Sequence, residues 1–172
     1  DQVDELASRL GQAGYGRGHR VLVLVENRPM FFVWFLALNR IGAGIVPVNP
    51  DLRTAELVDM VGLAEPVLAI GDPNRQAELV AAAQAAGIAL DCISPEHVGA
   101  VPPPQTQASD QAIGEAQTEA ALLMTSGTGG RPKGCILTNS YFLQAGRWYA
   151  SAGGLCTLTT KGERMITPLP VF

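Results

Sequence analysis

Val21-Leu22-Val23-Leu24-Val25 is an unbroken apolar run in which valines alternate with leucines. Both faces of such a strand are apolar, which is typical of a central parallel strand that helices cover on each side. The flanking segments alternate in the same way, and this order predicts an α/β fold with a mostly parallel sheet flanked by helices. We expect helices at 4–13, 30–41, 54 to about 63 and 74–86, and further strands at 44–48, 67–70 and 88–93.

Local signals indicate the helix ends and the core. Gly14 and Gly87 follow helical segments and can end them, and Thr54 can cap the helix that it begins. The segment 30–41 follows Pro29 and is apolar almost all round, with Trp34 among three phenylalanines. We expect Trp34 in the core, and this helix either between layers or covered by further protein.

Composition excludes two classes of partner. Lys and Arg number 12 against 16 Asp and Glu, a net charge of −4, so no basic face for a nucleic acid is expected. The longest strongly apolar run, Met30 to Leu38, has nine residues, whereas a membrane span needs about twenty. Hydrophobic residues make up 47% of the chain, which is enough for a buried core.

The cysteines and histidines show no metal or disulfide pattern. Cys92, Cys135 and Cys156 are odd in number and lack a CxxC pair, which favours buried, reduced thiols in a cytoplasmic protein. We expect His19 and His97, the two histidines, at exposed turns rather than in catalysis. No metal site is predicted from these residues.

The composition changes between residues 99 and 119, where Pro, Gln, Ser, Ala and Thr dominate. Such a stretch is typical of a functional loop or a linker, so we expect it to be mobile, as we do residues 127–131. The predicted organisation is an α/β unit at 1–98, a flexible connection at 99–119, and a hairpin, helix and strand at 120–172. Together they form one incomplete domain. Because the chain begins at Asp1 within a predicted helix, we interpret it as a fragment.

The chemistry is concentrated in one loop, Thr125-Ser126-Gly127-Thr128-Gly129-Gly130-Arg131-Pro132-Lys133-Gly134. A short apolar strand at 121–124 precedes it, and a strand at 135–137 and a helix with Asn139 as N-cap follow. Glycines let backbone N–H groups turn toward an anion, hydroxyls donate to phosphate oxygens, and Lys133 adds a positive charge. The residues predicted to bind phosphate are Thr125, Ser126, Gly127, Thr128, Gly129, Gly130 and Lys133.

This loop differs from the usual P-loop. The P-loop pattern is a glycine, any four residues, a second glycine, a lysine and then serine or threonine, and neither Gly127 nor Gly129 begins such a pattern. In addition, the loop is followed by a predicted strand, whereas a P-loop is followed by a helix. The structural alternative is a glycine-rich hairpin turn without a ligand.

Residues 125–134 resemble the phosphate-binding signature of the adenylate-forming superfamily, which includes acyl-CoA synthetases, aryl-CoA ligases, luciferases and peptide-synthetase adenylation domains. Nine of the ten positions match, counting the free one, and the departure is Gly129, where the family has a hydroxyl residue. Other stretches are similar in the same order: Gly18-His19-Arg20-Val21 with His19 in place of Asp, Asn27-Arg28-Pro29, residues 41–50, and residues 164–172.

The resemblance implies an enzyme that joins a carboxylate to the α-phosphate of ATP, releases pyrophosphate and passes the acyl group to a thiol. Mg²⁺ would be the cofactor and CoA the co-substrate, and the loop would hold the β- and γ-phosphates. The catalytic residues and the acidic metal ligand are expected beyond Phe172. The chain alone is therefore expected to be inactive, with the rest of its N-terminal domain and a C-terminal domain as partners. Homodimerisation is left open.

Three interpretations of the function remain. A CoA ligase is favoured by Val46-Pro47-Val48-Asn49-Pro50, because adenylation domains more often carry Pro-Leu-Asp there. The second is an adenylation domain that loads a carrier protein. The third is a non-catalytic nucleotide-binding or interaction module.

Overall fold

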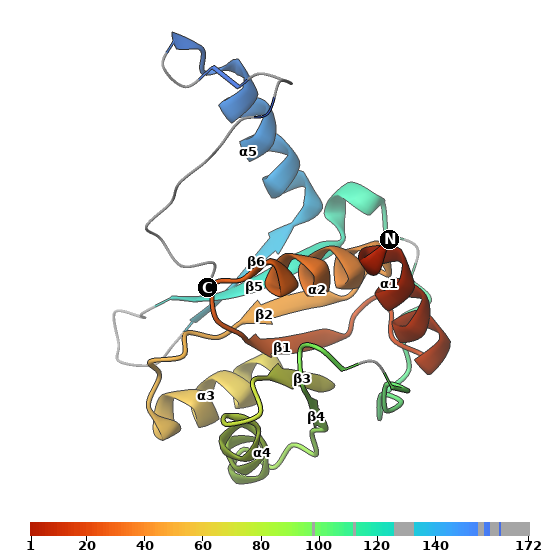
Figure 1. Ribbon diagram of the computed structural model, residues 1–172, viewed down its shortest axis with the longest axis vertical. Helices are drawn as coiled ribbons and strands as arrows, with labels where there is room; N and C mark the ends of the chain where they lie inside the picture. Colours follow the sequence, from red (N-terminus) through yellow and green to blue (C-terminus); the bar gives the residue numbers. More distant parts are fainter. Residues whose placement is uncertain (98, 112, 126–132, 155–156, 159–161, 163–172) are drawn as a thin grey trace.

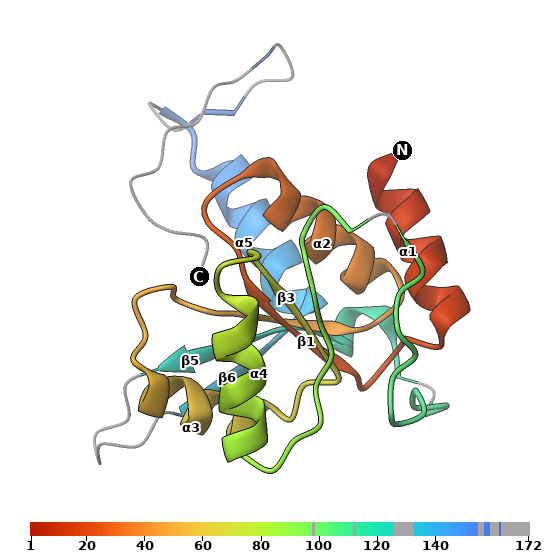
Figure 2. The same ribbon diagram turned by 60° about the horizontal axis from the view of Figure 1, so that its bottom comes forward.

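The apolar run at 21–25 lies near the centre of a six-stranded sheet with helices on both faces (Figures 1 and 2). The computed structural model describes residues 1–97, 99–111, 113–125, 133–154, 157–158 and 162. The strands are β1 (Arg20–Leu24), β2 (Gly44–Pro47), β3 (Leu68–Gly71), β4 (Cys92–Ile93), β5 (Glu119–Thr125) and β6 (Lys133–Thr138). The helices are α1 (Gln2–Ala13), α2 (Pro29–Arg40), α3 (Thr54–Ala64), α4 (Gln76–Ala85), the 3₁₀ helix η1 (Glu115–Gln117) and α5 (Asn139–Ser151).

The strand order is β4-β3-β1-β2-β5-β6. The first five strands in this order pair in parallel, and only β6 runs antiparallel, beside β5. The mostly parallel sheet predicted from the sequence is therefore confirmed. In the sequence, residues 126–132 connect β5 to β6, and an antiparallel pair, unlike a parallel one, needs no long crossover connection.

The helices cover the sheet as two layers, with α1 and α2 on one face and α3 and α4 on the other (Figure 2). Val21 and Val23 point into the first core, and Leu22 and Leu24 into the second, as the alternation of a strand requires. Trp34 of α2 is 1% exposed, which confirms its core position. Its indole N–H donates to the Pro95 carbonyl at 2.9 Å.

Helix α2 is buried on one side only. Phe31 packs in the core, whereas Phe32 is 52% exposed and Leu36 is 50% exposed. On a third side Phe35 meets Phe142 of α5, with 5.6 Å between ring centroids. Burial of the whole helix between layers, one of the two expectations, is therefore wrong.

Two predicted element ends need correction. The strand expected at 88–93 is reduced to Cys92–Ile93, because Ile88 N donates to Ala83 O (2.9 Å) and so closes the end of α4. Thr54 is the first residue of α3 rather than its cap. The cap residue is Arg53, whose backbone N–H donates to the Glu56 carboxylate at 2.8 Å.

Residues 101–111, which we call the strap, run across the turn between α1 and β1. Val101 is buried in the core on the α1–α2 face. Four polar contacts hold the strap to the turn. Tyr15 Oη donates to Pro102 O (2.7 Å), and His19 Nε2 lies 3.3 Å from Thr106 Oγ1. Ser109 N donates to Arg17 O (2.8 Å), and Arg17 Nη1 donates to Gln111 O (2.8 Å). These contacts could not be predicted from local sequence, because they join residues that are far apart in the chain, and the mobility of the segment stays a prediction.

His19 is buried, which corrects the expectation of an exposed turn position. It is 3% exposed, because the strap covers its ring. His97 is half-buried, and its Nε2 lies 3.0 Å from the Ala100 carbonyl oxygen. Both rings are therefore used in packing the loops around α1.

The thiols are less buried than expected. Cys135 is exposed on β6, an edge strand, and Cys92 is half-buried with its pKa raised to about 11 by burial. Both are free, and Cys156 lies outside the described residues. Within the described residues, no helix is long and apolar enough to cross a membrane.

A paired arginine and glutamate connect the starts of β1 and β5, the two neighbours of β2 in the sheet. Arg20 at the start of β1 donates from Nε and Nη2 to the two carboxylate oxygens of Glu119 at the start of β5, at 2.7 and 3.0 Å. Both side chains are about three-quarters buried, and the hydrogen bond to Glu119 raises the pKa of Arg20. Such a two-pronged, charge-assisted contact defines the position of one strand against the other.

We expect Arg20→Gln to lower the free energy of unfolding by about 1.5–3 kcal/mol, because glutamine cannot make both charge-assisted hydrogen bonds and leaves Glu119 unpaired. The matched control is Arg40→Gln, whose pair with Asp4 is exposed and should contribute less than about 1 kcal/mol. Urea denaturation measures both. Equal losses in the two variants would show that the Arg20 pair has no special role.

Candidate functional site

The predicted phosphate loop begins and ends at one pair of opposed residues. Thr125 is the last residue of β5 and Lys133 the first of β6, and they face each other in the ladder. The Thr125 hydroxyl donates to the Lys133 carbonyl oxygen at 3.3 Å. The structure therefore brings Thr125 and Lys133 together. Ser126, Gly127, Thr128, Gly129 and Gly130 lie outside the described residues.

This pair lies at the edge of the sheet where ligands bind in α/β proteins. Strands β1, β2, β3 and β5 are parallel, so their carboxyl ends share one edge, and Thr125 is the carboxyl end of β5 (Figure 1). In open α/β sheets, ligands bind outside the carboxyl ends of the strands. The fold thus puts the hydroxyl and the lysine at a suitable edge.

Gly134 allows the hairpin to pack closely. A Cβ at this position would lie 2.9 Å from Leu122 Cδ1 and 2.9 Å from Leu63 Cδ2. Leu122 belongs to β5 and Leu63 to α3, so a side chain here would push β6 away from both elements. Gly134 was predicted only as part of the motif, and this contact could not be predicted from the sequence because the approach of Leu63 depends on the tertiary fold.

Asn139 joins three elements immediately after the hairpin. Its Nδ2 donates to Glu115 O (2.9 Å), its Oδ1 accepts from Asn39 Nδ2 (2.6 Å), and its backbone N–H donates to Thr118 O (3.0 Å). The predicted role as N-cap is wrong: Thr138 is the cap residue and Asn139 the first residue of α5. The Asn139 side chain is instead used to fasten α5 to α2 and η1.

The described part of the loop has the chemistry of an anion site. Thr125 and Lys133 are both exposed, so a hydroxyl donor and a positive charge are open to a ligand at the same point. A lysine ammonium is a compact charge suited to phosphate oxygens. Among the described residues there is no group of three or more His, Cys, Asp or Glu that could hold a metal ion. The exposed hydroxyl and ammonium fit the oxygens of a polyphosphate.

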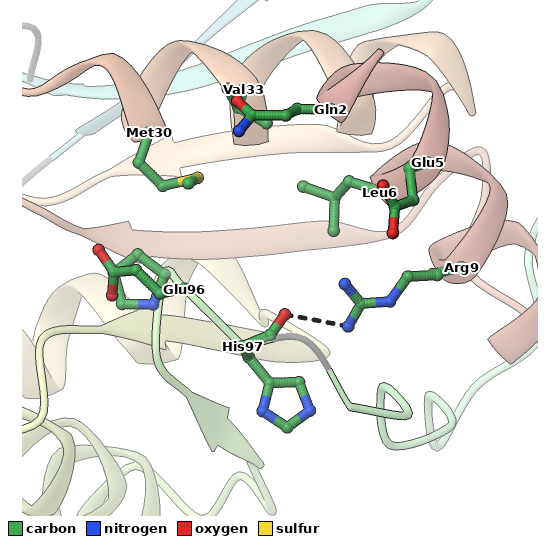
Figure 3. A pocket seen from close by; sticks show the side chains of 9 residues that line it. Gln2, Glu5, Leu6, Arg9, Met30, Val33, Glu96 and His97 are labelled. Atoms are coloured by element: carbon green, nitrogen blue, oxygen red, sulfur yellow. Dashed lines mark hydrogen bonds between the residues drawn. The ribbon is translucent and has the colours of Figure 1, made fainter.

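A separate hollow of about 160 Å³ lies between α1, α2 and residues 95–97 (Figure 3). Its lining includes Leu6, Met30 and Val33, but neither Thr125 nor Lys133. Two of the charged groups that line it already have partners within the chain. Arg9 donates to the His97 carbonyl at 3.0 Å, and Glu96 pairs with Arg28 at 3.0 Å. The hairpin, whose charge is open to solvent, is the better candidate site.

A hydroxyl and a lysine thus meet at the carboxyl edge of a mostly parallel sheet in an α/β protein, and a glycine-rich stretch of sequence connects them. The chain belongs to the AMP-binding enzyme family, whose pattern matches residues 1–172. It is thus a member of the adenylate-forming superfamily, as the resemblance implied.

Two relatives illustrate the range of the family. Olefin beta-lactone synthetase of Stenotrophomonas maltophilia is 30% identical over 165 residues, covering 88% of this chain and 29% of that protein. The fatty acid–[acyl-carrier-protein] ligase MmaC of Mycobacterium marinum is 27% identical, covering 98% of this chain and 33% of that protein. The chain therefore spans about a third or less of the length of these relatives.

Solved structures agree on the fold. ATP-bound MatB from Rhodopseudomonas palustris is similar with a TM-score of 0.65 and 26% identity, over 88% of this chain and 30% of MatB. The N-terminal subdomain of Klebsiella oxytoca NpsA, in complex with 3-hydroxybenzoyl-AMSN, is similar with a TM-score of 0.60 and 26% identity, over 80% of this chain and 32% of that one. The expected acyl-CoA synthetase-like architecture is confirmed.

We expect Gly134→Ala to lower stability by about 1–3 kcal/mol, because its methyl group would overpack against Leu122 and Leu63. Gly146→Ala is the matched control: a Cβ at Gly146, inside α5, meets no atom within 4 Å. There alanine should be neutral or stabilise by up to about 1 kcal/mol. Thermal unfolding compares the two variants. A Gly134→Ala protein as stable as the unaltered one would contradict the close packing of the hairpin.

Proposed function

We propose that this chain is the phosphate-binding part of a ligase that activates a carboxylic acid with ATP, forming an acyl-adenylate and pyrophosphate, and then transfers the acyl group to a thiol. The observation that carries the proposal is the opposition of Thr125 and Lys133 at the carboxyl edge of the sheet. Membership of the AMP-binding family supports the reaction class.

In this proposal the loop acts on the leaving group. The carboxylate oxygen attacks the α-phosphorus, and the bond to the bridging oxygen of pyrophosphate breaks, so negative charge grows on pyrophosphate. Lys133 and the hydroxyls of Thr125, Ser126 and Thr128, with the amides of Gly127, Gly129 and Gly130, would offset that charge. None of these groups is a nucleophile. Their contribution is to hold the β- and γ-phosphates in line for departure.

Mg²⁺ would neutralise phosphate oxygens when ATP binds. Among the described residues, no group of three or more His, Cys, Asp or Glu could hold it. As the resemblance implies, we assign the acidic ligand, and the residues that act on the acyl group, to parts of the enzyme outside this chain. A cytoplasmic location is part of the same proposal and is supported by the free thiols Cys92 and Cys135.

CoA is the proposed acceptor, and a carrier protein is the second candidate. The segment Val46 to Pro50 favours CoA by its resemblance. Two relatives are named as ligases that use an acyl-carrier protein, and this favours the second candidate: MmaC, and the medium/long-chain-fatty-acid–[acyl-carrier-protein] ligase FadD10 of Mycobacterium tuberculosis, which is 26% identical over 173 residues. Both names also support a fatty acid as the carboxylate. To distinguish the two acceptors, the same preformed adenylate is offered to CoA and to a carrier protein that bears phosphopantetheine. The acceptor whose thioester forms faster is the acceptor of this enzyme.

In the intact enzyme, Lys133→Ala should slow acyl-adenylate formation more than thiol transfer from a preformed adenylate. Pyrophosphate is present only in the first step, so only that step gains from the lysine. A lost charge-assisted contact costs about 1.5–3 kcal/mol, or roughly ten- to a hundredfold in rate. Carboxylate-dependent ATP–pyrophosphate exchange measures the first step, and thiol consumption from supplied adenylate measures the second.

The matched control for Lys133→Ala is Arg40→Ala, which removes an exposed cation at the end of α2 and should leave both rates unchanged. Gly129→Thr restores the hydroxyl of the family pattern and should keep or raise the rate of the first step. Equal losses in both steps for Lys133→Ala would contradict the proposed role of the loop, and so would the absence of any loss.

A further inference from the structure

His19 is the central contact between the strap and the turn that follows α1. Its ring is enclosed, with Gly16 N donating to Nδ1 at 3.3 Å on one side and Thr106 Oγ1 at 3.3 Å from Nε2 on the other. A Cβ on Gly16 would lie 3.0 Å from Ala108 Cβ, so the turn and the strap are in close contact here. Because His19 and Thr106 are 87 positions apart in the sequence, this contact depends on the tertiary fold.

The hydrogen bonds require a neutral imidazole. Nδ1 must present a lone pair to accept from the Gly16 amide, so Nε2 carries the proton and donates to Thr106 Oγ1. If Nδ1 were also protonated, its N–H would face the N–H of Gly16, and the hydrogen bond between them would be lost. The second proton would also create a buried positive charge, which is costly without a partner.

The groups around His19 offer no such partner among the described residues. Tyr15 meets the ring edge-on, with 6.0 Å between centroids, and burial raises the pKa of its phenol to about 12, so it stays neutral. The Arg17 guanidinium binds Gln111 O, and its buried Nε has no hydrogen-bond partner. Arg20 is bound to Glu119. From the strap, the Thr106 and Gln107 backbones are the groups at His19, and Asp110 is exposed.

We propose that His19 is a pH-sensitive latch: protonation of its imidazole releases the strap from the α1–β1 turn while the sheet stays folded. The protein would thus have a strap that is closed at neutral pH and opens as the pH falls below the ordinary titration range of histidine. His19 stands where the family pattern has Asp, so this response is a feature of this chain.

The opening is local because other contacts hold the ends of the strap. Val101 is anchored in the core at one end, and Asn139 holds Glu115 just beyond the other. The backbone of His19 also binds β2, through Gly44 N donating to His19 O at 2.9 Å. Protonation of the ring leaves these contacts in place.

The direction of the pH response follows from the pKa. Burial lowers the pKa of His19 below its ordinary value of 6.5 in the closed state, more than the strap carbonyls raise it. In the open state the ring is solvated and titrates near 6.5. The open state therefore binds the proton more tightly, and closure weakens as the pH falls from about 6.5 toward the lowered pKa.

The test is amide hydrogen exchange in the intact protein between pH 7.5 and 5.5, corrected for the intrinsic exchange rates. Protection of peptides from the strap should fall with pH, by up to roughly tenfold at pH 5.5, one unit below the ordinary pKa. Peptides from β1 and β3 should keep their protection. If the protection of the strap peptides against exchange is the same at pH 7.5 and pH 5.5, this result on the unaltered protein alone overturns the proposal.

His19→Asn supplies the matched variant, because its Oδ1 can accept from Gly16 N and does not titrate. The proposal requires strap protection in His19→Asn to be independent of pH, and His97→Asn to behave as the unaltered protein. If His19→Asn fails to keep β1 and β3 protected, His19→Gln takes its place. A pH response retained in the folded His19 variant, or an equal loss of protection in β1 and β3, would contradict the latch.

Discussion

The ion pair between Arg20 and Glu119, residues 99 positions apart, holds the second half of the sheet to the first. It joins the start of β1 to the start of β5 across β2, and a Cβ at Gly44 would lie only 2.8 Å from Glu119 Oε1, so the glycine in β2 makes room for it. Because β5 ends at Thr125, the alignment of β5 also determines where the phosphate loop leaves the sheet. The backbone contact of Thr118 with Asn139 then places α5. The ion pair, the pairing of β5 with β2 and the hydrogen bonds of Asn139 thus position the two ends of the hairpin together.

The architecture separates stability from ligand binding. Several charged groups elsewhere are paired within the chain: Arg28, for example, pairs with Asp72 and with Glu96, which lines the hollow of Figure 3. At the carboxyl end of β5, by contrast, Lys133 and Thr125 are exposed. An exposed cation beside a glycine-rich loop suits a ligand that brings its own negative charge. Family membership gives that ligand a chemical class, and the proposed ligase function assigns the loop to the pyrophosphate that departs.

Much of the fold could be predicted from local pattern. The apolar run at 21–25, the stop at Gly14 and the core position of Trp34 depend on nearby sequence, and each is confirmed. The errors occur where distant residues decide. His19 is buried because the strap returns to cover it, and β4 is short because Ile88 closes α4. In the site, the motif identified Thr125 and Lys133, but the packing of Gly134 against Leu63 could not be read without the fold.

The central claim is that the hairpin between β5 and β6 receives the phosphates of ATP. Amide exchange of the intact enzyme with and without ATP and Mg²⁺ tests it directly, because peptides that span 119–138 report on the hairpin and peptides that span 2–9 and 95–97 report on the hollow. We expect ATP to slow exchange in the hairpin peptides and to leave exchange in the peptides of the hollow unchanged. Slower exchange only at the hollow, or at neither place, would contradict it.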